Sequence, residues 1–99
     1  MITVFKTGRL FNGNEPSEWL VAAGREIKLQ CIGSGTATLK GRVSEEAEWA
    51  TIGLIKLSNF TIASSISDTE VYTADVSALH SVTVEASGFE AVEAVVYNY

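Results

Sequence analysis

Few residues in this sequence belong to the types that most often carry out chemistry. The 99 residues contain one histidine, His80, and one cysteine, Cys31. One cysteine cannot form an intrachain disulfide, and one thiol with one imidazole cannot complete a zinc site. A serine or cysteine nucleophile would depend on His80 as its base, and no G-x-S-x-G motif is present. An enzyme would need His80 and an acid in one cleft, and the sequence instead predicts no catalytic residue and no cofactor.

The groups that could bind an ion give equally weak patterns. The acids lie in two groups, at Glu45, Glu46 and Glu48 and at Asp68 and Glu70. Neither group has the spacing of an EF-hand loop, and neighbouring acids in loops are usually solvated surface. Gly33-Ser34-Gly35 is not followed by the G-K-[ST] of a phosphate-binding loop, so it predicts a turn. No metal site is predicted, and Cys31 is predicted to be a small buried apolar residue.

The charge balance argues against nucleic acid and membrane partners. Seven basic residues are scattered among twelve acidic ones, and the net charge is −5. Binding to a phosphate backbone needs clustered Lys and Arg. The longest apolar run, residues 19–23, is far shorter than a membrane span, and the N-terminal residues lack the apolar core of a secretory signal. We therefore expect a soluble protein made in the cytosol.

Alternating apolar and polar residues predict strands, most clearly at residues 26–31, 36–43 and 81–86. The predicted inner faces of these strands carry Leu29, Leu39, Val82 and Val84. Less regular segments predict further strands near residues 2–6, 18–23, 49–55, 58–63, 69–74 and 91–97. Eight or nine short strands without intervening helices predict an all-β fold, a single antiparallel β-sandwich over residues 1–99 with jelly-roll or immunoglobulin-like connections. Residues 7–18, which contain the only proline, are predicted to form a loop or an arm.

The aromatic residues leave two kinds of binding function open. A carbohydrate-binding or host-adhesion module would need at least two exposed, coplanar rings among Trp19, Trp49, Tyr72 and Tyr97. Aromatic residues are also common anchors in cores and in protein interfaces.

The last predicted strand is apolar on both faces. Two sets of residues alternate along it: Val92, Ala94 and Val96, and Val95, Tyr97 and Tyr99. Such a strand is either central in a packed sandwich or covered by a neighbouring molecule. Charged residues make up only 19% of the chain, which either abundant Ser and Thr or coverage by other subunits would explain.

Two runs of sequence carry further motifs, GSGTATLKGRVSEEAEWATIGLI at residues 33–55 and YTADVSALHSVTVEASG at residues 72–88. The first contains a Gly-rich turn, an alternating strand and Trp49 before a strand of small residues. The second contains an aromatic-Asp-Val turn that leads into another alternating strand. In these motifs the chain resembles small virion proteins of tailed bacteriophages. The resemblance implies a non-enzymatic structural protein of the virion, a decoration or cement protein that binds and stabilises the capsid shell.

The resemblance also implies the partners and the location. The expected partners are the major capsid protein and further copies of this chain, with a homotrimer favoured, and the expected location is the capsid exterior after synthesis in the host cytoplasm. The aromatic residues on the last strand and around the predicted arm are the predicted partner interface. They are Phe11, Trp19, Tyr97 and Tyr99.

Overall fold

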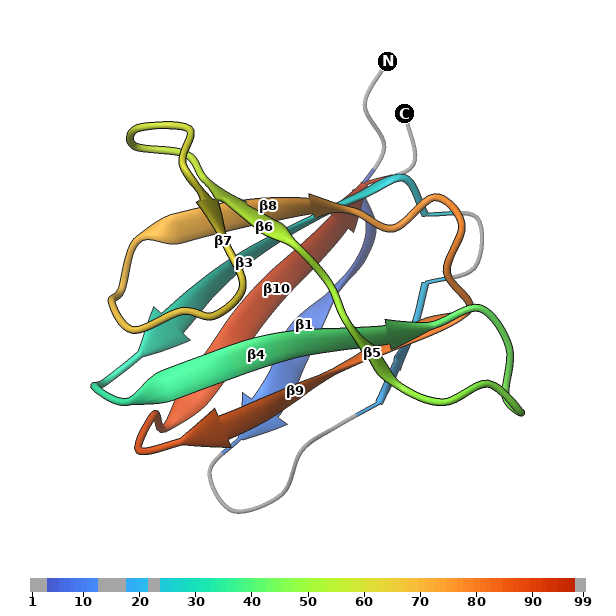
Figure 1. Cartoon of the computed structure of the whole chain (residues 1–99), viewed down its shortest axis with the longest axis horizontal. Coiled ribbons are helices and arrows are strands. Elements are labelled where there is room, and N and C mark those ends of the chain that lie inside the picture. The colour runs from blue at the N-terminus through green and yellow to red at the C-terminus, as the bar shows by residue number, and fades with distance from the viewer. Residues whose placement is uncertain (1–3, 13–17, 22–23, 98–99) are drawn as a thin grey trace.

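Two antiparallel sheets pack face to face in the computed structural model, which describes residues 4–12, 18–21 and 24–97 and, for residues 4–12, the backbone alone. The strands within these residues are β1 (Val4–Asn12), β2 (Trp19–Leu20), β3 (Glu26–Ile32), β4 (Thr36–Arg42), β5 (Ala50–Thr51), β6 (Leu54–Lys56), β7 (Ile62–Ala63), β8 (Val71–Asp75), β9 (Ser81–Ser87) and β10 (Ala91–Tyr97). The larger sheet has the order β1-β10-β3-β8-β6-β7, and the smaller has the order β2-β9-β4-β5 (Figure 1). The predicted all-β antiparallel sandwich is confirmed.

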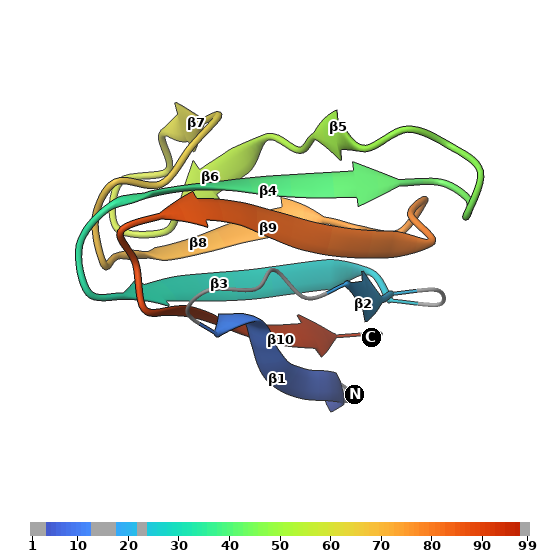
Figure 2. The same cartoon turned by 90° about the horizontal axis from the view of Figure 1, so that it is seen from below.

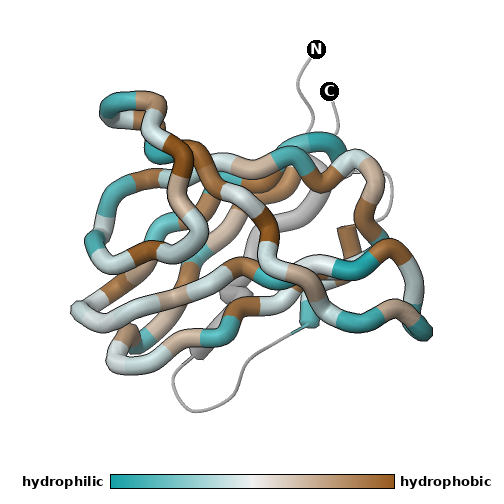
Figure 3. Tube along the Cα trace, viewed as in Figure 1, coloured by the Kyte–Doolittle hydropathy of each residue, from teal (hydrophilic) through white to brown (hydrophobic). Residues whose placement is uncertain are grey.

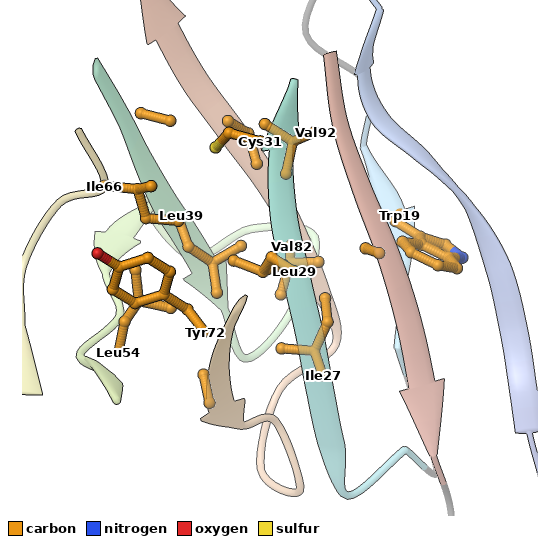
Figure 4. Packing of buried hydrophobic residues seen from close by; sticks show 14 of the residues in the cluster. Trp19, Ile27, Leu29, Cys31, Leu39, Leu54, Ile66, Tyr72, Val82 and Val92 are labelled. Carbon is orange, nitrogen blue, oxygen red and sulfur yellow. The ribbon is translucent and has the colours of Figure 1, made fainter. Parts of the chain in front are cut away.

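The core lies between the two sheets and follows the predicted alternation. Leu29 of β3 faces Leu39 of β4, and both are almost fully buried (Figure 4). Val82 and Val84 of β9 are also buried, so the four residues predicted to face inward do so together. Every second residue of β3 and β4 is buried because successive side chains of a strand point to opposite faces.

The predicted arm over residues 7–18 is corrected by the backbone of its first half. Residues 7–12 belong to β1, which pairs with β10 in a register that runs from Val4 opposite Tyr97 to Asn12 opposite Ala91. Two irregularities in this register, between Val4 and Lys6 and between Arg9 and Phe11, make the strand bend. Residues 13–17 lie outside the described residues.

The segment after Trp49 crosses from one sheet to the other. β5 pairs with β4 in the smaller sheet, whereas β6 pairs with β8 in the larger sheet. The predicted strands at residues 49–55 and 58–63 are therefore replaced by three pieces of two or three residues. This division explains why ten strands are found where eight or nine were predicted.

Two turns interlock at one end of the sandwich, where β3 leads to β4 and β9 leads to β10 (Figure 2). Gly88 has a φ of 93°, which glycine adopts without strain. A Cβ atom on Gly35 would lie 2.1 Å from the carbonyl oxygen of Ser87, and one on Gly88 would lie 2.7 Å from that of Ser34. Only glycine at both positions allows the two turns to approach this closely.

Candidate functional site

The four aromatic residues predicted at the interface differ in their exposure and in how much of each the structure describes. Trp19 is only 4% exposed and belongs to the core, so it does not offer the exposed aromatic surface that the sequence predicted. Its position in β2 directs the ring inward because its strand partner, Val82, also faces the core. Tyr97 ends β10 and is half-buried. The side chain of Phe11 and the whole of Tyr99 lie outside the described residues.

Tyr97 lies on the outer face of the larger sheet, beside a shallow depression. The ammonium nitrogen of Lys28 lies 4.8 Å from the centre of the Tyr97 ring and 3.5 Å from Oε1 of Glu26. The depression, of about 400 Å³, is lined mainly by outward side chains of three strands, at Lys28, Gln30, Val71, Glu93 and Val95. β10 is a central strand between β1 and β3, and its outward residues are only half-buried. This face can therefore still bury apolar surface against a partner.

A hydrogen-bonded cluster joins β6, β8 and the loop between β7 and β8. Nζ of Lys56 lies 2.8 Å from Oδ2 of Asp68, and the hydroxyl of Tyr72 donates to the same carboxylate at 3.0 Å. The hydrogen bond from Lys56 lowers the pKa of Asp68 and raises the pKa of Lys56. Burial of the ring, followed by its contact with Asp68, raises the pKa of Tyr72. All three groups satisfy one another, so the cluster acts as a tether between elements.

Arg42 closes one end of the outer face of the smaller sheet. Its Nε donates to Oγ of Ser81 at 3.2 Å, its Nη1 to the carbonyl oxygen of Glu45 at 2.9 Å and its Nη2 to Oε2 of Glu18 at 2.8 Å. The guanidinium also stacks over the ring of Trp49, with Cζ 4.3 Å from the centroid. One side chain thus holds β4, β9, the segment before β2 and the loop before β5 together.

His80 lies beside this network and contacts a serine. Its Nδ1 is 3.2 Å from Oγ of Ser81, which also accepts a hydrogen bond from Nε of Arg42. The Ser81 residue is fully buried, so a substrate has no access to its hydroxyl. These contacts hold strands in place. Among the described residues, no group of three His, Cys, Asp or Glu side chains is placed to hold a metal ion.

Cys31 is buried in the core, as predicted. Burial, with a smaller contribution from the charge of Asp68, raises the pKa of the thiol to about 11. The thiol therefore stays protonated and unreactive near neutral pH.

The four aromatic residues considered for a sugar-binding platform, all within the described residues, do not form one. Trp19 and Tyr72 are buried. Trp49 is covered by Arg42 beside the smaller sheet, whereas Tyr97 lies on the outer face of the larger sheet. The two partly exposed rings therefore face different directions.

A projecting hairpin, which the sequence patterns did not predict, is formed by β6, β7 and the turn between them and is here named the β6–β7 hairpin (residues 54–63; Figure 1). Ile55, Phe60 and Ile62 are exposed on it, and Phe60 and Ile62 keep more than three quarters of their surface in water. Figure 3 shows hydrophobic segments, in brown, within this projecting part. The available signal was the run of residues 57–67, which contains no charged residue.

The comparisons with known proteins identify two solved structures of the same fold. The SPBc2 prophage-derived protein YomS matches with a TM-score of 0.74 and 21% identity, over 98% of this chain and 91% of that protein. The PBSX exported protein XepA matches with a TM-score of 0.75 and 17% identity, over 98% of this chain but only 37% of that protein. No protein-family model matches the sequence, and no curated protein sequence matches it either. No helix able to cross a membrane was found in the described part of the chain.

Proposed function

We propose that the protein is a non-enzymatic structural component of a bacteriophage particle, a decoration or cement protein that binds the capsid shell and further copies of itself. The observation that carries the proposal is the match of 98% of the chain to the SPBc2 prophage-derived protein YomS, with a second match to the PBSX exported protein XepA. The sequence resemblance to small virion proteins, which rests on residues 33–55 and 72–88, supports the same class. The major capsid protein is the proposed partner, on the capsid exterior.

The proposed contact with the capsid lies at the end of β10. Val95 and Tyr97 face outward there, next to the depression lined by Lys28. Aromatic side chains at the centre of an interface commonly contribute about 2 kcal/mol or more to binding. Phe11 and Tyr99 stay predictions from the sequence for this interface, and a homotrimer is the proposed assembly.

A role without catalysis agrees with the state of the reactive groups. The thiol of Cys31 is protonated and buried, and the hydroxyl of Ser81 is enclosed by Arg42 and His80. His80→Ala is therefore expected to leave binding to capsids unchanged. Loss of a measured function in this variant, with the fold intact by circular dichroism, would contradict a purely structural role.

The test measures how fully the protein occupies phage heads assembled from the same genome with this gene deleted. Tyr97→Ala should lower occupancy by about tenfold or more at limiting protein. This variant is cleaner than truncation after Val96, because the carbonyl oxygen of Tyr97 accepts a hydrogen bond of 2.7 Å from the backbone of Arg25. Val43→Ala, on an exposed turn, is the matched control. Full occupancy by Tyr97→Ala would place the interface elsewhere, and no binding by the unaltered protein would end the proposal.

A further inference from the structure

We propose that the β6–β7 hairpin is a self-association surface, on which β7 pairs antiparallel with β7 of a second copy of this chain. The inference goes beyond the proposed function, because it adds a two-fold contact between copies that is separate from the proposed trimer and from the surface at Tyr97. Three features support such pairing: the backbone of β7, the charges beside each sheet edge and the conformation of Phe60.

The backbone of β7 has hydrogen-bonding groups directed away from its own sheet. β7 is the edge strand of the larger sheet and pairs with β6, with Ile62 opposite Ile55. The N–H of Lys56 bonds to the carbonyl oxygen of Thr61 at 2.9 Å, one residue along. Hydrogen-bonded and non-bonded pairs alternate in an antiparallel ladder, so the N–H and C=O of Ile62 point to the open edge. They are placed to pair with another strand.

The edge at β7 lacks the charge that protects the other sheet edges. Those edges carry charged residues within the strand or within two residues of it: Lys6 and Arg9 in β1, Glu18 before β2 and Glu48 before β5. Residues 57–67 contain none, and the flanking charges, Lys56 and Asp68, neutralise each other at 2.8 Å. Charges on edge strands prevent pairing with other molecules, and an unprotected edge permits it.

Phe60 has an unfavourable backbone conformation, and its side chain is not buried in the core of its own chain. Its φ is 57°, in the left-handed region that is rare for bulky residues. The turn is fixed by hydrogen bonds from the N–H of Phe60 to the carbonyl oxygen of Lys56, at 2.7 Å, and from Thr61 to the side chain of Asn59. Phe60 is 76% exposed, so its ring adds no buried apolar surface to the core. Asn or Gly would satisfy this backbone better, and an aromatic ring here is explained by contact with a partner.

A second copy is the partner that this surface fits. A chain with a net charge of −5 repels its own copies, and the repulsion is weakest where both copies present an uncharged segment. Antiparallel pairing of one edge with itself is self-complementary about a two-fold axis and would place the two Ile62 side chains close together. The apolar area is small, three side chains from each copy, so we expect a weak dimer with a Kd of roughly 10 µM to 1 mM.

The test is sedimentation equilibrium of the whole chain from low micromolar concentration to about 1 mM. The unaltered protein should shift from monomer to dimer over this range. Ile62→Lys adds a charge at an exposed edge position and should weaken dimerisation about tenfold or more while retaining the circular dichroism spectrum. Val43→Lys adds the same charge at another exposed position and should dimerise at least as well as the unaltered protein, because it lowers the overall repulsion between copies.

Phe60→Asn separates a binding role from a structural one. Asn tolerates the left-handed conformation, so this variant should melt at a higher temperature and dimerise more weakly. A lower melting temperature with unchanged dimerisation would overturn the role of Phe60. A protein that stays monomeric up to the highest concentration, or that dimerises equally well as Ile62→Lys, would overturn the inference. Binding to uncharged phosphatidylcholine vesicles without dimerisation would overturn it in favour of a lipid partner. Capsid occupancy, measured separately with Tyr97→Ala, reports on the proposed function alone.

Discussion

The two outer faces of the sandwich differ in how far their side chains satisfy one another. On the smaller sheet, Arg42 bonds to Ser81 and Glu18 and stacks on Trp49, so the part of this face around Arg42 is closed from within the chain. On the larger sheet, Ile55 and Ile62 remain exposed. A surface whose polar groups already have partners gains little from binding, whereas exposed apolar groups gain by leaving water. The exposed side chains of the β6–β7 hairpin therefore have more to gain from a partner than the surface around Arg42.

Both faces depend on the same core, and removing part of it should have the largest effect. Leu39→Ala deletes a side chain that is 1% exposed between the sheets, and it should lower the free energy of unfolding by about 2–5 kcal/mol. Urea denaturation followed by circular dichroism measures the change. Val43→Ala, on an exposed turn, should stay within about 0.5 kcal/mol. A loss of the same small size for Leu39→Ala would place β4 in another register.

Opening the closed face should have an intermediate effect on stability and none on association. Arg42→Ala removes hydrogen bonds to Ser81 and Glu18 and uncovers Trp49, and it should lower the free energy of unfolding by about 2 kcal/mol. The fluorescence of the uncovered tryptophan should also become more accessible to acrylamide. Denaturation and quenching measure the two changes.

Lys40→Ala is the matched control on the same strand and face. Lys40 lies 3.9 Å from a largely exposed Glu85, so its loss should lower the free energy of unfolding by less than about 1 kcal/mol. If Arg42→Ala and Lys40→Ala have equal effects, the smaller sheet is not closed by Arg42. If Arg42→Ala weakens dimerisation, the division of roles between the two faces is wrong.

The smallest effect should come from the tether beneath the β6–β7 hairpin. The hydrogen bond from Lys56 lowers the folded-state pKa of Asp68 from its usual value of 3.8. A carboxyl with a lowered pKa stabilises the folded protein above its unfolded pKa, and that stabilisation is lost as the pH falls through the folded pKa. Asp68→Asn should therefore melt at a lower temperature than the unaltered protein near pH 6. The difference between the two melting temperatures should become smaller as the pH falls below about 4. Thermal melts across this range measure the difference, and a difference that widens toward low pH would contradict this role.

The strands that the sequence predicted best are those whose patterns are set locally. β3 and β4 alternate along their whole length and β9 alternates from Val82 to Glu85, because a core on one side and water on the other select apolar and polar residues in turn. β10 was also located, and its apolar outer face is explained in part by its central place between β1 and β3.

Features that depend on distant pairings were not predictable from local patterns. Residues 7–12 form a strand only because β10, at the other end of the sequence, pairs with them. Leu54 and Ile55 are adjacent apolar residues, and only the register of β6 with β8 decides that Leu54 is buried and Ile55 exposed. The network of Arg42 draws on four separate segments, and no spacing in the sequence reveals it.

The central place of β10 has a consequence for synthesis on the ribosome. β10 lies between β1 and β3, yet it is translated after the other nine described strands. Until β10 emerges, β1 has no neighbour in its sheet and β3 has one side open, so the larger sheet cannot close while the chain is growing. Sheets built on such non-local pairing fold slowly, and their unpaired edges are open to misassembly. The nascent chain is therefore most exposed to chaperones, and to other nascent chains, in the interval before β10 is released.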